Sequence, residues 1–335
     1  MGYLLEGHWH EEAPSNDASG RFVRQASRFH HWVTPDGAAG PTGDGGFPAE
    51  VGRYHLYVSL ACPWAHRALI FRKLKKLEQV IGVSVVDAIM GPEGWVFTDA
   101  PGAIPDTAEG KKRLSEIYLL ASERYTGRVT VPVLWDKKNK TIVNNESSEI
   151  IRMFNSAFDA LTSVRADYYP KALRGEIDAI NRPIYETVNN GVYRSGFATT
   201  QEAYEEACRS LFATLDRLEE RLTTQHYLVG STLTEADWRF FTTLVRFDAV
   251  YYGHFKCNVR RIADYPNLSN YLRDLYQVPG VAETVNMDHI KTHYYASHRK
   301  INPSGIVPIG PELNFAAPHD RARFAAASGA VRAAS

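Results

Sequence analysis

The fold is decided by residues 54–67, which are YHLYVSLACPWAHR. Aromatic and β-branched residues dominate the first seven positions, a composition typical of a β-strand. Apolar residues then recur at positions 64, 65, 68, 69, 71, 74 and 77, the spacing of one helix face, and Pro63 stands where a first helical turn tolerates proline. The sequence predicts a strand that ends near Cys62 and a helix that begins directly after it.

The following hundred residues extend this pattern into a small α/β domain. A helix begins at Glu146, with acidic residues in its first turn, where the helix dipole favours negative charge. Further strands are expected at 80–88, 130–135 and 141–143, and a further helix near 111–124. The order β-α-β-(insert)-β-β-α predicts one domain over residues 51–160.

The rest of the chain divides into an all-helical domain and two extensions. Helices are expected at 170–190, 201–224, 234–251 and 265–277, with almost no strand signal between them. We therefore place a helical domain at 168–300. Residues 1–50 are expected to form an N-terminal extension, whose stretch 34–48 is rich in Gly and Pro without periodicity, which predicts an ordered or semi-ordered loop there. Residues 301–335 are expected to form an extended arm.

Composition excludes several classes of protein. The 335 residues carry 38 Lys plus Arg and 38 Asp plus Glu, so the basic surplus expected of a nucleic-acid-binding protein is missing. No apolar run approaches the roughly 18 residues that a membrane helix needs, and residues 1–8 lack the features of a signal peptide. Three cysteines cannot form a disulfide framework. We expect a soluble protein of the reducing cytoplasm.

Cys62 is the candidate nucleophile, because a helix N-terminus favours the thiolate form of a cysteine. In the motif CPWA, Ala65 stands where a dithiol centre has its second cysteine, so an oxidised Cys62 must form a mixed disulfide with an external thiol such as glutathione. The alternatives are a buried structural cysteine and a zinc site with His66, for which no further ligand pair is evident. Cys208 and Cys257 lack this setting and are expected to be structural or incidental.

Two further features predict a binding site for a small peptide. Pro132 opens a strand that otherwise resembles a central one, so the Val131–Pro132 bond is expected to be cis or the strand to be an edge. Glu146 and Ser147 start a helix whose free N–H groups can hold a carboxylate, while Glu146 can hold an ammonium. The γ-glutamyl end of glutathione offers both groups. Helix capping is the simpler role for the same residues.

Several motifs resemble the Xi-class glutathione transferases, the glutathionyl-hydroquinone reductases. The resemblance extends over nearly the whole chain, including both extensions. It is carried by YHLYVSLACPWAHR at 54–67, TVPVLWD at 130–136, NESSEII at 145–151, NNGVY at 189–193, LVRFD at 244–248, HFKCN at 254–258 and INP at 301–303.

This resemblance implies a fold, a partner and a reaction. A thioredoxin-like domain would precede an all-helical domain, and two copies would pair through the helical domains as a homodimer. The Cys62 thiolate would attack the sulfur of a glutathionyl-hydroquinone and release the hydroquinone, and a second glutathione would resolve the mixed disulfide. No metal is implied.

The resemblance also assigns the remaining site residues. Those that fall where the family holds glutathione are Trp95, Arg128, Val131, Glu146 and Ser147, and those that fall where it holds the quinol are Tyr193, Tyr251 and Tyr294. Trp95 lies in a polar insert with little local core, which favours a ligand contact. The tyrosines could equally be ordinary core aromatics, and 251/252 and 294/295 are doublets in which we choose the first.

Two other functions share these residues. A glutaredoxin-like or dehydroascorbate-type thiol transferase would use the same thiolate on different oxidants. A non-catalytic scaffold of glutathione-transferase type needs no nucleophile at position 62, so the intact CPWA motif disfavours it.

Overall fold

The computed structural model describes residues 2–11 and 15–324, which form two compact units. Within the described residues, the first unit comprises the chain up to Ser15, Arg24–Asp167 and Glu283–Val307; we call it the α/β unit. The second comprises Asn16–Val23, Tyr168–Ala282 and the chain from Pro308 on; we call it the helical unit. The predicted order of an α/β domain followed by an all-helical one is confirmed.

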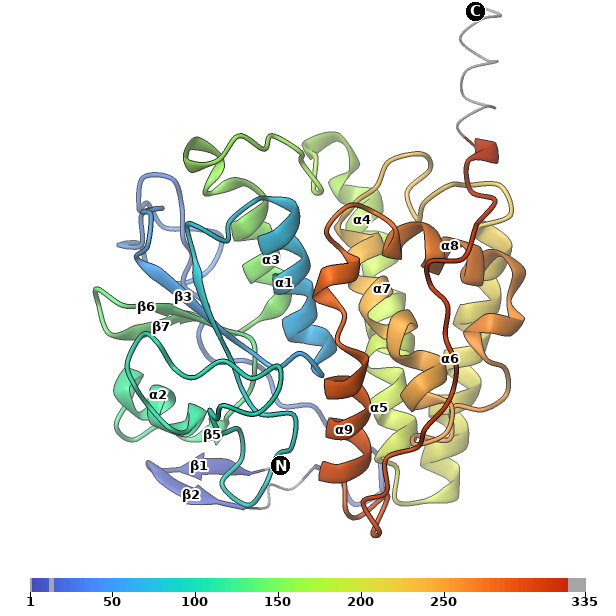
Figure 1. Cartoon of the computed structure of the whole chain (residues 1–335), viewed down its shortest axis with the longest axis horizontal. Coiled ribbons are helices and arrows are strands. Elements are labelled where there is room, and N and C mark those ends of the chain that lie inside the picture. The colour runs from blue at the N-terminus through green and yellow to red at the C-terminus, as the bar shows by residue number, and fades with distance from the viewer. Residues whose placement is uncertain (1, 12–14, 325–335) are drawn as a thin grey trace, which may run out of the picture. The chain divides into compact units, whose positions relative to one another are not determined.

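A four-stranded mixed sheet is the centre of the α/β unit (Figure 1). Its order is β4-β3-β6-β7, with β3 parallel to β4 and antiparallel to β6, which in turn is antiparallel to β7. All five residues of β3 are buried, which explains its unbroken apolar and aromatic composition. The strands span Tyr54–Val58 (β3), Gly82–Val85 (β4), Val133–Asp136 (β6) and Thr141–Asn144 (β7).

Helices α1, α2 and α3 of this unit lie between or after its strands in the chain. Helix α1 (Pro63–Leu74) follows β3 directly, and helix α3 (Ser147–Ser156) follows β7 and lies beside α1 (Figure 1). Helix α2 (Leu114–Ala121) lies in the insert between β4 and β5. The predicted strand-to-helix junctions at Cys62 and Glu146 are confirmed, so both candidate site segments stand at helix N-termini.

A second, smaller sheet includes two strands of the N-terminal extension, where no strand was predicted. Strand β1 (Tyr3–Leu5) pairs antiparallel with β2 (His8–His10) and with β5 (Gly127–Arg128). These strands are two or three residues long, too short to show periodicity. Their third partner is more than a hundred residues away, so no local pattern could indicate the pairing.

Four helices of the helical unit match predicted ones, with shorter bounds: α4 (Arg174–Pro183), α6 (Gln201–Arg221), α7 (Glu235–Arg246) and α8 (Pro266–Tyr276). The short helix α5 (Gly191–Gly196) was not predicted. Wider π-helical turns continue α4 over Ile184–Asn189 and α7 over Phe247–Tyr251, so the expected helices 170–190 and 234–251 are not regular throughout.

Helix α9 (Met287–Ser297) departs from the expected domain boundaries. The sequence placed residues 168–300 in the helical domain, but Glu283–Val307 cluster with the α/β unit. The contacts explain this: His66 bonds Thr284 at 2.8 Å, and His289 bonds the Pro101 carbonyl at 2.7 Å. Of the expected C-terminal arm, residues 325–335 lie outside the described residues.

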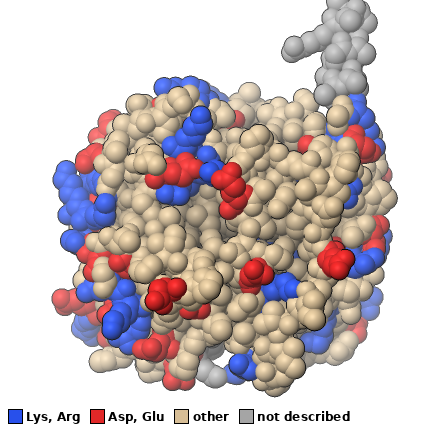
Figure 2. Space-filling view, viewed as in Figure 1, with Lys and Arg blue, Asp and Glu red and all other residues tan. Residues whose placement is uncertain are grey.

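Surface charge and hydropathy give two further findings. On the face shown in Figure 2, basic and acidic side chains are interspersed among neutral ones. Among the helices of residues 2–11 and 15–324, none has the length and apolarity to cross a membrane.

Candidate functional site

Cys62 occupies the N-cap of α1, with Pro63 at the first helical position. The side chain is partly exposed, and its Sγ lies 3.6 Å from the carbonyl oxygen of Val131. The amide N–H groups of a helix's first turn and its dipole both favour an anion at this position. The position of Cys62 at the start of α1 is thus compatible with the accessible thiolate that the sequence predicts.

The Val131–Pro132 peptide bond is cis. Since β6 lies between β3 and β7, the alternative of an edge strand is wrong. Val131 is 5% exposed, and its carbonyl is the group that approaches Cys62.

The other two thiols lie in the helical unit and are buried. Burial raises the pKa of Cys208, and it raises the pKa of Cys257 further, because a thiolate loses its hydration there. Neither thiol is suited to act as a nucleophile at neutral pH.

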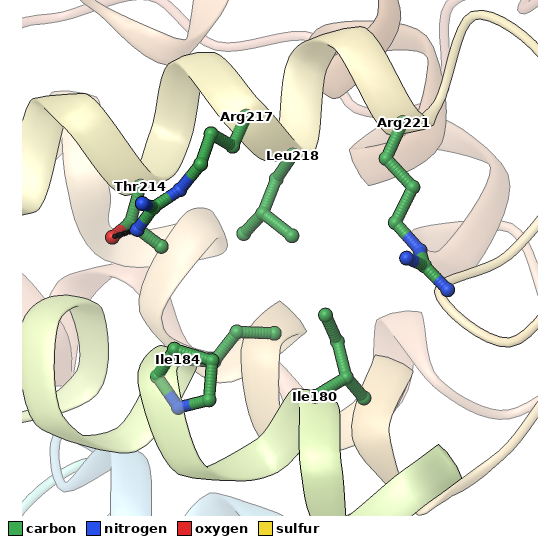
Figure 3. A pocket seen from close by; sticks show the side chains of 7 residues that line it. Ile180, Ile184, Thr214, Arg217, Leu218 and Arg221 are labelled. Atoms are coloured by element: carbon green, nitrogen blue, oxygen red, sulfur yellow. Dashed lines mark hydrogen bonds between the residues drawn. The ribbon is translucent and has the colours of Figure 1, made fainter.

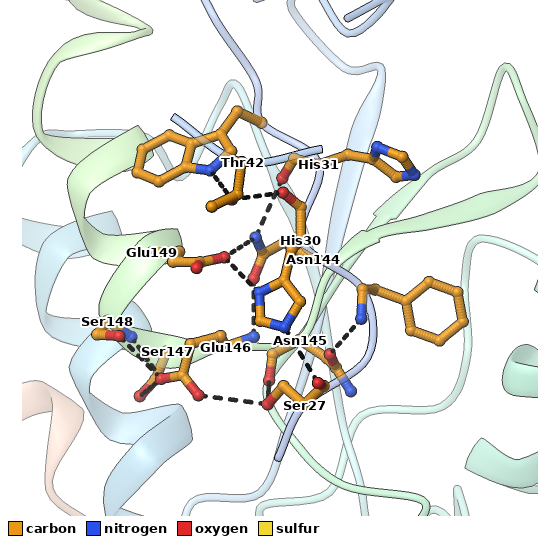
Figure 4. A network of polar contacts seen from close by, with 12 residues as sticks. Ser27, His30, His31, Thr42, Asn144, Asn145, Glu146, Ser147, Ser148 and Glu149 are labelled. Atoms are coloured by element: carbon orange, nitrogen blue, oxygen red, sulfur yellow. Dashed lines mark hydrogen bonds and ion pairs between the residues drawn. The ribbon is translucent and has the colours of Figure 1, made fainter. Parts of the chain in front are cut away.

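Glu146 is the N-cap of α3, and its carboxylate is held from several directions (Figure 4). Oε1 accepts hydrogen bonds from the backbone N–H and the hydroxyl of Ser148, both at 3.0 Å. Oε2 lies 3.3 Å from the hydroxyl of Ser27. A carboxylate beside a helix N-terminus can receive an ammonium on one side while the helix receives a carboxylate on the other.

Arginine side chains gather around Trp64, two residues after the nucleophile. The guanidinium carbons of Arg24 and Arg67 lie 4.8 and 4.5 Å from the centre of the Trp64 ring. Arg67 also donates to the hydroxyl of Ser147 at 3.3 Å, which links α1 to the start of α3. This positive charge suits a ligand with more than one carboxylate, such as glutathione.

Arg128 belongs to the same electropositive region. Burial lowers the pKa of its guanidinium, and the charge of Arg24 lowers it further. An anion bound nearby would offset both unfavourable effects.

The prediction that Trp95 lies in an insert with little core of its own is wrong. Its side chain is only 6% exposed, and its ring stacks on His293 of α9, with ring centres 4.9 Å apart and planes 24° apart. The insert does have a core, which α9 supplies from nearly 200 residues later in the chain. The sequence environment of Trp95 does not reveal that packing.

The three quinol candidates lie in different units. Tyr193 and Tyr251 belong to the helical unit, where their ring centres are 6.1 Å apart and both also contact Phe255. Tyr294 lies on α9 of the α/β unit and contacts His293 and His298. In each doublet, the first tyrosine is buried and the second is partly exposed.

The helical unit also has a cavity of about 370 Å³ between α4 and α6 (Figure 3). No predicted site residue lines it. The lining residues are Ile180, Pro183, Ile184, Thr214, Arg217, Leu218 and Arg221. In the described part of the chain, no group of three or more His, Cys, Asp and Glu side chains could hold a metal ion.

Sequence reasoning missed the N-terminal contributors to this site. Arg24, Ser27 and His30 all approach it from the extension, and Ser27 meets Glu146 across 119 positions of sequence. Nothing local in a polar segment indicates such a contact. The scattered apolar residues of the segment, among them Phe29 and Val33, are a signal that it packs on something but do not indicate on what.

Comparison with known proteins identifies the family. Two protein-family models match this chain. The N-terminal domain of glutathione S-transferases matches residues 61–157, and their C-terminal domain matches residues 201–274. The glutathionyl-hydroquinone reductase YqjG of Escherichia coli strain K12 is 59% identical over 323 residues, covering 96% of this chain and 98% of that protein. The chain belongs to the glutathionyl-hydroquinone reductases, the Xi class of glutathione transferases.

Other members of the Xi class agree with this assignment. The glutathionyl-hydroquinone reductase PcpF of Sphingobium chlorophenolicum is 56% identical over 312 residues, covering 93% of this chain and 96% of that protein. The glutathione-bound structure of E. coli YqjG has a TM-score of 0.88 at 58% identity, covering 95% of this chain and 98% of that one. The Xi-class enzyme of Natrialba magadii has a TM-score of 0.89 at 50% identity, covering 96% and 97%. The thioredoxin-like and helical glutathione-transferase domains are thereby confirmed.

Proposed function

We propose that this Xi-class protein removes glutathione from glutathionyl-hydroquinones, using Cys62 as the nucleophile and a second glutathione as the reductant. The observation that carries the proposal is the position of Cys62: a partly exposed thiol at the N-cap of α1, with Ala65 where a resolving cysteine would stand. The relatives named as glutathionyl-hydroquinone reductases support the substrate class.

The reaction has two thiol steps. The ring carbon that bears sulfur first takes up a proton, which gives the keto form. The Cys62 thiolate then attacks the glutathionyl sulfur, the sulfur–carbon bond breaks, and its electron pair passes through the ring to the quinol oxygen, which takes up a proton as the ring becomes aromatic again. The products are a hydroquinone and a disulfide between Cys62 and glutathione. A second glutathione thiolate attacks this disulfide, which restores the Cys62 thiolate and releases glutathione disulfide.

The chain's own groups have separate tasks in this scheme. Glu146 receives the ammonium of the γ-glutamyl group, and Ser147 with the α3 N-terminus receives its carboxylate. Trp95, Arg128 and Val131 complete the glutathione site. These assignments rest on the resemblance together with the burial, charge and contacts of the same residues.

We assign the quinol to Tyr193, Tyr251 and Tyr294. An aryl carbanion is a poor leaving group unless the ring is first protonated to its keto form. Phenolic hydroxyls that donate to the quinol oxygens would favour that tautomer and stabilise the developing charge.

The tyrosine assignment predicts a defect confined to the first step. Tyr→Phe at each position should lower turnover of glutathionyl-menadiol, by up to about 10²–10³-fold where the site is dry. It should spare resolution of the Cys62 mixed disulfide, which involves no aryl group. If all three Tyr→Phe variants kept wild-type turnover, the tyrosines would be ordinary core aromatics and the assignment would be refuted.

The central test compares the wild type with Cys62→Ser. The variant should lose reduction of glutathionyl-menadiol, since an alcohol at neutral pH is a far poorer nucleophile than a thiolate. Cys208→Ser is the matched control and should keep wild-type turnover. Mass spectrometry after a single turnover should find one glutathionyl group, on Cys62. The mechanism would be refuted if Cys62→Ser kept a tenth or more of wild-type turnover, or if the glutathionyl group were found on another cysteine.

We also propose a homodimer formed through the helical units and a cytoplasmic location, where glutathione is abundant and thiols stay reduced. Sedimentation equilibrium of the purified chain tests the first, and a monomer at all concentrations would refute it.

A further inference from the structure

The segment from Ser27 to His31, which we call the N-terminal arm, extends the edge of the main sheet at β7. The backbone N–H of His31 donates to the Val143 carbonyl at 3.0 Å, and the Asn144 side chain donates to the His31 carbonyl at 3.0 Å. Phe29 bonds Asn145 through both its N–H, at 3.2 Å, and its carbonyl, at 3.3 Å. These contacts fix the arm against the β7–α3 junction, where Glu146 lies (Figure 4).

His30 ties the arm to α3 itself. Its Nδ1 lies 2.9 Å from Oε2 of Glu149, and its Nε2 lies 3.0 Å from the carbonyl oxygen of Ser27. The same Glu149 oxygen accepts a hydrogen bond from Asn144 at 2.6 Å. One imidazole therefore connects the first turn of α3 to the backbone of Ser27 and restrains the position of that residue.

That hydroxyl reaches the carboxylate of Glu146. Ser27 Oγ lies 3.3 Å from Glu146 Oε2 and 3.2 Å from the Asn145 carbonyl oxygen, and its single hydrogen can serve one of them at a time. Since Ser148 holds the other oxygen of Glu146, each oxygen has a donor within reach. A carboxylate restrained at both oxygens loses little freedom when an ammonium binds it.

We propose that Ser27, held by His30, is a positioning residue for the Glu146 carboxylate and thereby tunes recognition of the ligand's α-ammonium group. The inference rests on the glutathione site described under the proposed function. It assigns to the N-terminal extension a part in ligand recognition in addition to its part in folding.

The expected effect is selective for one end of the ligand. Ser27→Ala should raise the Kd of the full-length protein for S-methylglutathione about three- to tenfold, since the bond to a charged acceptor is long and shared. An analogue of S-methylglutathione that lacks the α-amino group should bind the wild type and Ser27→Ala with equal affinity. With glutathionyl-menadiol, KM should rise while kcat stays near the wild-type value.

Two variants guard against a purely structural effect. Ser27→Thr keeps the hydroxyl and should restore wild-type affinity. Ser19→Ala removes a hydroxyl that bonds Asp17, elsewhere in the N-terminal extension, and should leave both affinities unchanged. Calorimetric titration of all four proteins with both ligands gives the comparison.

The outcomes separate this inference from the proposed function. Equal losses for the two ligands in Ser27→Ala, or no loss for either, would overturn the positioning role while wild-type binding of S-methylglutathione stands. Failure of the wild type to bind S-methylglutathione would refute the proposed function and the ligand named here together.

Discussion

Replacing Glu146 should separate helix capping from ligand binding, because the proposed function gives both tasks to one carboxylate. As the N-cap of α3 it needs only an acceptor oxygen for the Ser148 N–H, which a glutamine also provides. As the partner of an ammonium it needs a negative charge, which glutamine lacks. Glu146→Gln should therefore fold normally and bind glutathione poorly, whereas Glu146→Ala should be impaired in both respects.

The structure sets the size of both effects. Losing an N-cap acceptor costs about 1 kcal/mol of helix stability, so Glu146→Ala should lower the free energy of unfolding by that amount. Losing a hydrogen bond to a charged group costs about 1.5–3 kcal/mol, or about 10- to 150-fold in affinity. Glu146 is partly exposed and already accepts bonds from Ser27 and Ser148, so we expect the lower end, about tenfold.

Two measurements on the same protein samples decide the question. Chemical denaturation reports stability, and calorimetric titration with S-methylglutathione reports affinity. Glu205→Gln, the same chemical change on the surface of α6, is the control and should alter neither quantity appreciably. Wild-type affinity in Glu146→Gln, or a loss of stability in it as large as in Glu146→Ala, would refute the reasoning.

Three further predictions concern reactivity, pH and specificity. Iodoacetamide at neutral pH should alkylate Cys62 in the native protein and leave Cys208 and Cys257 unmodified, because burial raises the pKa of both buried thiols. Peptide mass spectrometry measures the labelling, and equal labelling of the three cysteines would contradict the prediction. Partial burial works against the charge of His30, but hydrogen bonds to Glu149 and to the Ser27 carbonyl outweigh it, so the pKa of His30 is raised. Its contribution to stability should therefore be complete below about pH 6 and be lost as pH rises through the raised pKa. Thermal melts of wild type and His30→Gln should differ most at acid pH, and the difference should shrink as pH rises; a constant difference would count against the pair. Finally, conjugation of glutathione to chlorodinitrobenzene should be slow, since a cysteine at the nucleophile position forms disulfides where a hydroxyl would stabilise the glutathione thiolate; rates comparable with the reductase reaction would argue for an ordinary transferase.

Local patterns predicted those elements whose residues lie next to one another in the sequence. The strand–Cys–Pro–helix junction at 54–74 is such a case, since strand composition, proline position and helical spacing all occur within one window. The capped start of α3 at Glu146 is another. Both were found because their signals need no knowledge of distant residues.

The remaining parts of the site depend on contacts that the sequence does not encode locally. Trp95 has a stacking partner on α9, and Glu146 has a hydroxyl partner on the N-terminal arm. The sequence placed α9 in the wrong unit because helical character says nothing about which surface a helix packs on. Similarity to the Xi class supplied the roles of the tyrosines, which no spacing rule could distinguish among eighteen.

The allocation of α9 to the α/β unit has a consequence for the nascent chain. Domains generally fold as units while they emerge from the ribosome, the N-terminal one first. Here the first unit has made its whole sheet by Asn144, yet Glu283–Val307 must still be translated before Trp95 meets His293 and His66 meets Thr284. At a synthesis rate of about 5–20 residues per second, that segment is completed several seconds or more after the last strand of the sheet. Maturation of the Cys62 site is thereby tied to completion of nearly the whole polypeptide.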